Sequence, residues 1–206
     1  MLLALVRHAQ AVSNALKILS DEYDKFPLTE EGVSQAKRAA EELKKLKPEA
    51  VFSSPVLRAR QTAEIIAESL GLKVALDERL RERGLGELNG KRVEENSEHW
   101  KLRLARAREQ VRDLEGWESM QARMLDFLND VRNRGYRVVV AVSHYDPIRA
   151  LIGHVFGLSD FQAWGIMIPN ASITLIAAKS PLKVLGIALP LIPDEVLESL
   201  KLQGLV

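Results

Sequence analysis

Two strand-forming runs, of which the first is continuously apolar and the second is the strongest strand signal in the chain, constrain the fold more than any other feature of the sequence. The run LLALV occupies residues 2–6, and the run YRVVVAVS occupies residues 136–143. Strands that read as unbroken apolar runs, without alternating polar residues, are typical of parallel sheets covered on both faces. The two runs therefore predict buried strands in a largely parallel sheet.

Amphipathic segments with helix-start signals follow the predicted strands. Thr29 is a candidate N-cap, and the two glutamates after it suit the positive end of a helix dipole. Ser54 and Asp146 are candidate N-caps of two further helices, because a proline that suits the first helical position follows each of them. Residues 117–135 show the apolar spacing of another helix.

The remaining segments complete an alternation of strands and helices. Further strands are expected at residues 50–54, 170–178 and 183–190, the last two near a sheet edge, and a short helix at 194–202. This order predicts an α/β fold, with a doubly wound, mostly parallel sheet and helices on both faces. The 206 residues suffice for one well-cored domain, expected over residues 1–206. Residues 84–116 are polar and carry both charge signs, and we expect a cap-like excursion there.

Polar side chains follow three of the predicted strands at the point where each strand ends. These pairs are Arg7-His8, Ser53-Ser54 and Ser143-His144. Because ligands of open α/β sheets bind outside the carboxyl ends of the strands, we expect these side chains to share one site. Arg58 lies about one turn into the helix expected after Ser54. Its positive charge would be repelled by the positive end of the helix dipole unless an anion bound between them. Forked guanidinium donors suit phosphate oxygens, so the sequence predicts a pocket for a phosphoryl group.

The chemistry of such a pocket gives each side chain a candidate role. His8 is the expected nucleophile, because it follows a rigid strand beside Arg7 and a neutral imidazole can attack phosphorus. His144 and the arginines would stabilise the charge of the transition state, so no metal or other cofactor is required. Glu82 is the candidate proton donor, since a buried carboxyl beside a phosphate has a raised pKa. Glu87 is the second choice.

Composition excludes several other classes of protein. Lys and Arg total 29 and Asp and Glu total 28, which argues against a nucleic-acid or anionic-membrane binder. The chain has no cysteine, so disulfides and thiolate chemistry are excluded, and a cytoplasmic location is expected. No apolar run approaches the roughly 20 residues that span a bilayer.

Six segments of the chain together resemble the histidine phosphatase superfamily, whose members are also called phosphoglycerate mutase-like proteins. The segments are VRHAQAVSN, LTEEGVSQAKRAAEEL, VFSSPVLRARQTAE, LRERGLGELNG, VSHYDPIRAL and NASIT. Each is weakly specific alone, but five or more in this order are highly specific. The resemblance runs from the first strand to about Ile176. Ala9 and Ala11 depart from it, because a glycine and frequently a threonine stand at these positions in the family.

The resemblance implies a catalytic domain in which His8 becomes a phosphohistidine. It implies that Arg7, Arg58 and His144 hold the phosphate, that Asn14 assists and that Glu82 donates the proton. The expected activity is that of a metal-independent phosphatase, with a small phosphorylated metabolite as its partner. A bisphosphoglycerate-dependent phosphoglycerate mutase is the alternative, because both reactions share the first step. A phospho-ligand-binding regulator without activity is a third hypothesis.

Simpler roles compete with these assignments. The arginines could be ordinary helix-capping cations, the histidines could be structural, and Glu82 could simply pair with Arg81 or Arg83. Asn14 could be an N-cap. The run at residues 183–191 would suit pairing across a homodimer, and equally an edge covered within one chain.

Overall fold

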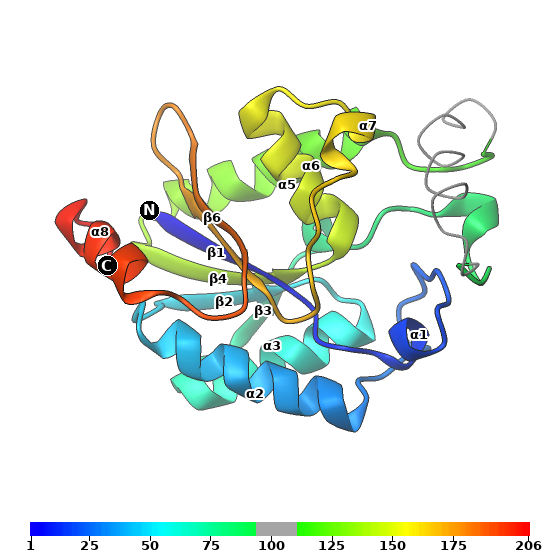
Figure 1. The fold of residues 1–206 in the computed structure, drawn as a ribbon, viewed down its shortest axis with the longest axis horizontal. Coiled ribbons are helices and arrows are strands. Elements are labelled where there is room, and N and C mark those ends of the chain that lie inside the picture. The colour runs from blue at the N-terminus through cyan, green and yellow to red at the C-terminus, as the bar shows by residue number, and fades with distance from the viewer. Residues whose placement is uncertain (94–110) are drawn as a thin grey trace.

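The computed structural model describes residues 1–93 and 111–206 (Figure 1). Its strands are β1 (Leu2–Arg7), β2 (Ala50–Ser53), β3 (Val74–Leu76), β4 (Val138–Ser143), β5 (Ile173–Ala177) and β6 (Lys183–Leu189). They form one sheet in the order β3-β2-β4-β1-β5-β6. Strands β3, β2, β4 and β1 are mutually parallel, and β5 runs antiparallel to both of its neighbours. The predicted α/β fold with a mostly parallel sheet is confirmed.

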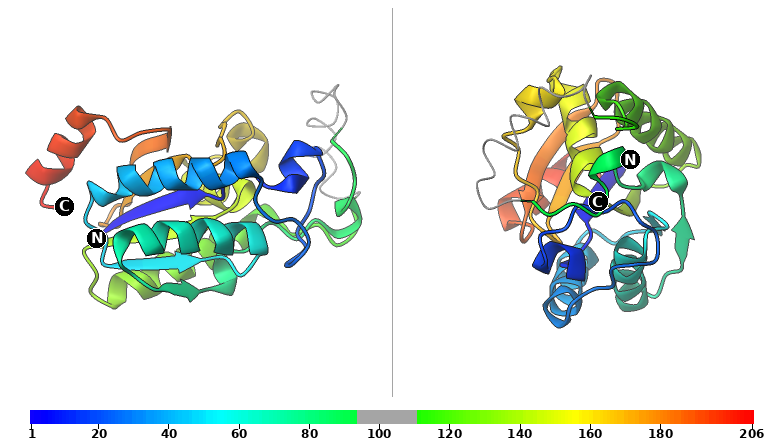
Figure 2. Two further views of the ribbon diagram at one scale, coloured as in Figure 1. Left: turned by 90° about the horizontal axis from the view of Figure 1, so that it is seen from below. Right: turned by 90° about the vertical axis from the view of Figure 1, so that its right-hand side faces the viewer.

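Helices cover both faces of this sheet. They are α1 (Val12–Ala15), α2 (Glu30–Lys44), α3 (Leu57–Leu70), α5 (Trp117–Asn133), α6 (Tyr145–Phe156), α7 (Asp160–Ala163) and α8 (Asp194–Leu202), with short 3₁₀ turns η1 (Glu78–Leu80) and η2 (Gly86–Leu88). Figures 1 and 2 show α2 and α3 on one face and α5 and α6 on the other. No helix among residues 1–93 and 111–206 is long and apolar enough to cross a membrane.

Strand β4 shows why its residues are apolar without alternation. Val138, Val140 and Val142 belong to the core cluster that includes residues of α2 and α3. Val139 and Ala141 belong to the opposite cluster, which includes residues of α5 and α6. Because both faces of the strand are buried, its first five residues are apolar, and Ser143 at its carboxyl end is the first polar residue. The central strands therefore form a rigid base for the residues that follow them.

The starts of three helices decide where the polar residues at the strand ends lie. Thr29 caps α2 as predicted, and its Oγ1 accepts a hydrogen bond from the amide of Gly32 at 3.0 Å. The N-cap assigned to Ser54 is wrong, because α3 begins at Leu57 and Val56 occupies the N-cap position. Ser54 Oγ instead accepts a hydrogen bond from the amide of Val56 at 3.2 Å and lies 2.8 Å from His144 Nε2.

The N-cap assigned to Asp146 is also wrong. Helix α6 begins directly after β4, at Tyr145, and His144 is its N-cap. Pro147 is accommodated in the first turn, where a backbone N–H has no partner within the helix. Asp146 is consequently free to pair with Arg149 through its side chain instead of capping the helix.

The charged excursion predicted at residues 84–116 is described only at its two flanks. Residues 94–110 lie outside the described part of the chain. The flanks contact each other, because the amide of Gly84 donates to Glu115 Oε2 at 3.0 Å and the amide of Glu87 donates to the carbonyl of Arg112 at 3.3 Å. That this segment forms a cap stays a prediction.

Candidate active site at the carboxyl ends of the strands

The ends of β1 and β4 bring the two histidines together. Arg7 pairs with Ser143 in the parallel register, and the amide of His8 donates to the carbonyl of Ser143 at 2.9 Å. His144 follows immediately, and the centroids of the two imidazole rings are 5.1 Å apart. Both histidines are buried. Two residues 136 positions apart are thus adjacent because the strands that carry them are parallel neighbours.

Arg58 joins both imidazoles. It lies in the first turn of α3, where its Nε donates to His8 Nε2 at 3.1 Å and its Nη2 lies 3.2 Å from His144 Nδ1. Nη2 also donates to the carbonyl of Ser20 at 2.8 Å. Its Nη1 is buried and has no hydrogen-bond acceptor among the described residues. A buried cation with an unused donor at a helix N-terminus is suited to an anion.

The hydrogen bonds of His8 determine which of its nitrogens is basic. Nδ1 lies 2.8 Å from the carbonyl of Ala9, which can only accept, so this nitrogen carries the proton. The amide of Ala9 donates to Thr62 Oγ1 at 3.0 Å and holds that carbonyl in place. Burial, followed by the charges of Arg58 and Arg7, lowers the pKa of His8 well below its ordinary value. The ring is neutral and presents the Nε2 lone pair to Arg58.

His144 is also neutral, with the opposite tautomer. Its Nδ1 faces the guanidinium of Arg58, which can only donate, and its Nε2 lies 2.8 Å from Ser54 Oγ. Burial and then the charge of Arg58 lower the pKa of His144 well below its ordinary value. An anion placed between Arg58 and the ring would favour protonation of Nδ1, which would make it a donor to that anion.

Arg7 is held by contacts to the loop before β5 and to α6. Its Nη1 donates to the carbonyl of Ile168 at 2.6 Å, and its guanidinium lies 4.9 Å from the centroid of the Tyr145 ring. Arg7 Nε is buried without a hydrogen-bond partner among the described residues. The arginine is therefore fixed in orientation and retains donor capacity.

Asn14 lies within α1 and is not its N-cap, which is Ala11. Asn14 Oδ1 accepts a hydrogen bond from the amide of Ala11 at 2.9 Å and faces Asn170 Nδ2 at 3.3 Å. Asn170 Nδ2 also donates to the carbonyl of His8 at 3.0 Å. The oxygen of Asn14 is thus occupied, which leaves its amide nitrogen as the group that could donate to a ligand.

Glu82 follows η1 in a segment that is held by α5. Arg123 donates to the carbonyls of Arg79, Arg81 and Glu82 at 2.6, 2.8 and 3.3 Å. Glu82 Oε2 lies 3.8 Å from His144 Nδ1. Burial, and then the charge of Asp146, raise the pKa of Glu82 to about 7, against the opposing effect of Arg58. A carboxyl with this pKa can give and take a proton near neutral pH.

The arginines that flank Glu82 have other anionic partners. Arg81 pairs with Glu115 at 3.3 Å, and the Arg83 side chain pairs with Asp160 at 3.2 Å. The contact from Arg83 to Glu82 comes from its backbone amide, at 2.9 Å. Glu87, the second choice for the proton donor, is absent from the described lining of the cavity.

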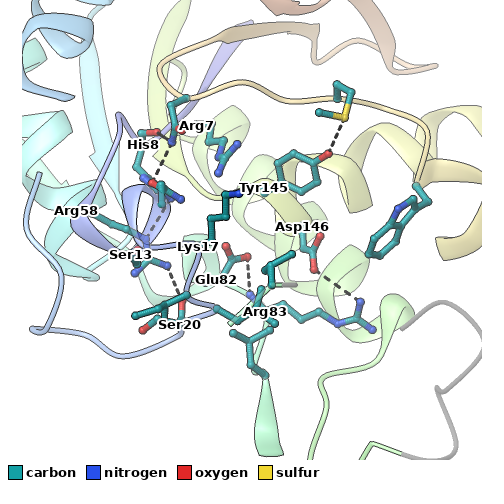
Figure 3. Close-up of a pocket in the computed structure, with 18 of the residues that line it drawn as sticks. Arg7, His8, Ser13, Lys17, Ser20, Arg58, Glu82, Arg83, Tyr145 and Asp146 are labelled. Atoms are coloured by element: carbon teal, nitrogen blue, oxygen red, sulfur yellow. Dashed lines mark hydrogen bonds and ion pairs between the residues drawn. The ribbon is translucent and has the colours of Figure 1, made fainter. Parts of the chain in front are cut away.

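These side chains surround a cavity of about 440 Å³ (Figure 3). Arg7, His8, Asn14, Arg58 and Glu82 line it, and the buried His144 contacts Arg58 behind them. The outer wall is largely apolar, with Ile18, Leu19, Leu85, Val93, Leu114, Trp164 and Met167, and it also includes Lys17, Arg83, Tyr145 and Asp146. Among residues 1–93 and 111–206, no group of three or more His, Asp or Glu side chains could hold a metal ion.

Sequence reasoning assigned no role to several residues that shape this site. Ser20 acts through its backbone carbonyl, which no side-chain pattern reveals. Thr62 and Asn170 lie in the segments VFSSPVLRARQTAE and NASIT, which were quoted for the family resemblance. The resemblance of these segments did not indicate a role for either residue. Arg123 reaches the segment of Glu82 from α5, which follows residues 94–110 in the chain, and only the packing of α5 reveals this contact.

Comparisons with known proteins agree with this geometry. The family model for the histidine phosphatase superfamily, branch 1, matches residues 3–184. A 2,3-bisphosphoglycerate-dependent phosphoglycerate mutase of Thermoplasma acidophilum is 37% identical over 174 residues, which cover 84% of this chain and 84% of that protein. A putative phosphoserine phosphatase 2 of Hydrogenobacter thermophilus is 34% identical over 179 residues, covering 84% and 88% of the two chains.

Solved structures show the same relationship. The mycobacterial glucosyl-3-phosphoglycerate phosphatase in complex with VO3 superposes with a TM-score of 0.78 at 27% identity, over 90% of this chain and 97% of that one. The family match extends over most of the strands that carry the site, and the expected resemblance is confirmed. The chain therefore belongs to the histidine phosphatase superfamily.

Proposed function

We propose that this protein is a metal-independent phosphatase that hydrolyses small phosphomonoesters through a phosphohistidine on His8. One observation carries the proposal. The neutral His8 Nε2 faces Arg58 Nε at 3.1 Å, and Arg58 also reaches His144, 3.8 Å from Glu82. A nucleophile, two anion-binding groups and an acid of suitable pKa are thus adjacent.

The first step transfers the phosphoryl group to the enzyme. His8 Nε2 attacks phosphorus while the ester P–O bond breaks, and Glu82 gives its proton to the departing oxygen. Arg7, Arg58 and the amide nitrogen of Asn14 donate to the phosphoryl oxygens. These oxygens become more charged in the in-line transition state, so fixed donors stabilise that state.

The second step returns the enzyme to its starting form. The carboxylate of Glu82 accepts a proton from water as the water oxygen attacks the phosphohistidine. The P–Nε2 bond breaks, inorganic phosphate leaves, and Glu82 is protonated again. Because the carbonyl of Ala9 keeps the proton on Nδ1, His8 recovers the same reactive tautomer in every cycle.

The apolar outer wall of the cavity supports hydrolysis over mutase activity. A mutase must hold a second acidic group of the phosphoglycerate while the phosphoryl group returns to it. Outside the phosphate end, most of the described lining is aliphatic or aromatic, and its cations are Lys17 and Arg83, of which Arg83 is already paired with Asp160 at 3.2 Å. This lining suits an ester with a largely apolar body. The mutase remains the second candidate, because the Thermoplasma relative at 37% identity carries that name. The small-metabolite substrate, a cytoplasmic location and a homodimer stay predictions.

Two assays on one preparation test the proposal. The first measures phosphate release from p-nitrophenyl phosphate and a panel of metabolite phosphates, with chelator and with vanadate. The second measures conversion between phosphoglycerate isomers with and without bisphosphoglycerate primer. We expect metal-independent, vanadate-sensitive phosphate release that the His8→Ala substitution abolishes. Primer-dependent isomerisation with negligible phosphate release would favour the mutase, and full turnover by H8A would reject the mechanism.

A further inference from the structure

A buried group of four charged side chains lies beside Glu82, and the mechanism above does not use it. It comprises Arg83, Asp146, Arg149 and Asp160, here called the acid-side cluster. Arg149 is fully buried, and Arg83 and Asp160 are nearly so. Arg83 Nη1 lies 3.2 Å from Asp160 Oδ2 and 3.7 Å from Asp146 Oδ2. Charged side chains are rarely buried in this way unless they are paired, because their desolvation is costly.

Arg83 connects the acid-side cluster to the proton donor. Its backbone amide donates to Glu82 Oε1 at 2.9 Å, while its side chain pairs with Asp146 and Asp160. Glu82, Arg83 and Asp146 all line the cavity, and Figure 3 shows them in one part of it. The ion pairs therefore fix the residue whose amide orients the carboxyl group of Glu82.

This arrangement distinguishes the two oxygens of Glu82. Oε1 accepts the amide of Arg83 and is engaged as an acceptor. Oε2 points toward the phosphate end of the site, 3.8 Å from His144 Nδ1. The geometry thus identifies Oε2 as the oxygen that carries the proton and gives it to the leaving group.

The charges around Glu82 are mostly positive. Arg7 lies at the end of β1 and His8 follows it, Lys17 follows α1, and Arg58 comes from α3. Arg83 is adjacent in the chain, and Arg123 comes from α5, where its charge is paired with Glu115 at 2.8 Å. His144 is the N-cap of α6, and Asp146 lies in the first turn of that helix. Both histidines are held neutral by burial and the neighbouring guanidinium groups, which lower the pKa of each. Asp146 is the one anion besides Glu82 in the described lining of the cavity.

Asp146 keeps its charge although it is largely buried. Burial would raise its pKa, but Arg149 and then Arg83 outweigh this effect and the pKa is lowered. Arg149 Nη2 donates to Asp146 Oδ1, and the guanidinium of Arg149 lies 4.8 Å from the Tyr145 ring and 4.7 Å from the Trp164 ring. The anion therefore has a fixed place in the cavity lining that it shares with Glu82, and Arg83 contacts both residues.

Building on the proposed phosphatase function, we propose that Asp146 is a positioning residue that acts through Glu82. Its fixed negative charge keeps the proton on Glu82 Oε2 until the leaving oxygen of the ester takes it. Arg83 and Arg149 hold this charge in place. After the transfer, Glu82 and Asp146 are two anions in the lining of one cavity, and their repulsion favours recovery by Glu82 of a proton from the attacking water.

The test is the pH dependence of kcat/KM for phenyl phosphate, whose leaving oxygen needs a proton. This parameter reports the ionisation of the free enzyme, and activity falls at high pH as Glu82 loses its proton. The Asp146→Asn substitution removes the repelling charge, so this fall should move to lower pH by about one unit. With p-nitrophenyl phosphate, whose leaving group needs the proton less, D146N should lose less activity.

Matched variants separate this role from a structural one. Asp160 belongs to the same cluster but does not line the cavity. The Asp160→Asn substitution should therefore leave the pH at which kcat/KM falls unchanged. Asp146→Glu keeps the charge and should restore the wild-type position. If the single variant D146N does not fold, the double variant Asp146→Asn with Arg149→Gln replaces it, because it removes both charges of the buried pair. The double variant should move the high-pH fall of kcat/KM to lower pH by the amount expected for D146N.

The outcomes distinguish this inference from the function on which it rests. An unshifted fall in an active D146N enzyme, or an equal shift in D160N, would overturn the role of Asp146 and leave the phosphatase mechanism intact. Turnover by H8A would overturn the mechanism itself. A shift in D146N that D146E reverses supports the inference.

Discussion

Replacing Glu82 with glutamine should make the protein more stable at alkaline pH while it abolishes efficient turnover. Burial of the Glu82 carboxyl, and then the negative charge of Asp146, raise the pKa of Glu82 from an ordinary value of 4.5 to about 7. Each pKa unit corresponds to about 1.4 kcal/mol, so this interval corresponds to about 3 kcal/mol. Glutamine keeps an acceptor for the amide of Arg83 and never ionises, so Glu82→Gln removes this cost.

The direction of the effect follows from proton linkage. In the unfolded chain Glu82 ionises near its ordinary pKa, whereas in the folded protein it retains its proton up to about pH 7. Between these values unfolding releases a proton, so rising pH favours the unfolded state. Below pH 4 the wild type and the variant should be affected equally, and above pH 7 the variant should be more stable by about 3 kcal/mol.

Urea unfolding at a series of pH values measures this difference directly. The free energy of unfolding of the variant minus that of the wild type cancels the contributions of the titrating groups that do not interact with Glu82. Glu64→Gln is a suitable control, because the Glu64 side chain is 58% exposed and surface substitutions usually change stability by less than about 0.5 kcal/mol. A difference for E82Q that does not vary with pH would refute the burial and charge argument for Glu82.

Three further substitutions probe the base of the site. Arg58→Lys should lower kcat/KM for p-nitrophenyl phosphate by about 10²–10³-fold, since lysine cannot reach both imidazoles and the phosphate; near-normal kinetics would contradict the shared-donor geometry. Gly32→Ala should lower the free energy of unfolding in urea by about 1–3 kcal/mol and reduce turnover, because a Cβ would overlap the carbonyl of Gln10, two residues after His8. An unchanged stability and turnover would show that this loop adjusts easily. Phe127→Ala, at a fully buried position on α5, should cost about 3–5 kcal/mol with little change in KM, and a loss below 1 kcal/mol would contradict its place in the core.

Local patterns in the sequence were sufficient for the base of the site. The continuous apolar run of β1 predicted a strand covered on both faces, and the polar pairs at strand ends placed His8 and His144 at the same edge. These inferences succeed because the period of burial and the direction of parallel strands are properties of short segments. The sequence pattern failed at helix starts, where Ser54 and Asp146 were assigned as N-caps but the connection after each strand determined the first helical residue.

What the sequence by itself determined was the type of fold, the order of its segments and the set of side chains that a phosphoryl site needs. Only the tertiary structure decided which nitrogen of His8 is basic and which oxygen of Glu82 faces the site. It also decided that Arg83 and Asp146 stand beside the acid. These properties depend on hydrogen bonds and charges between segments that are distant along the chain, and neither periodicity nor residue type encodes such contacts.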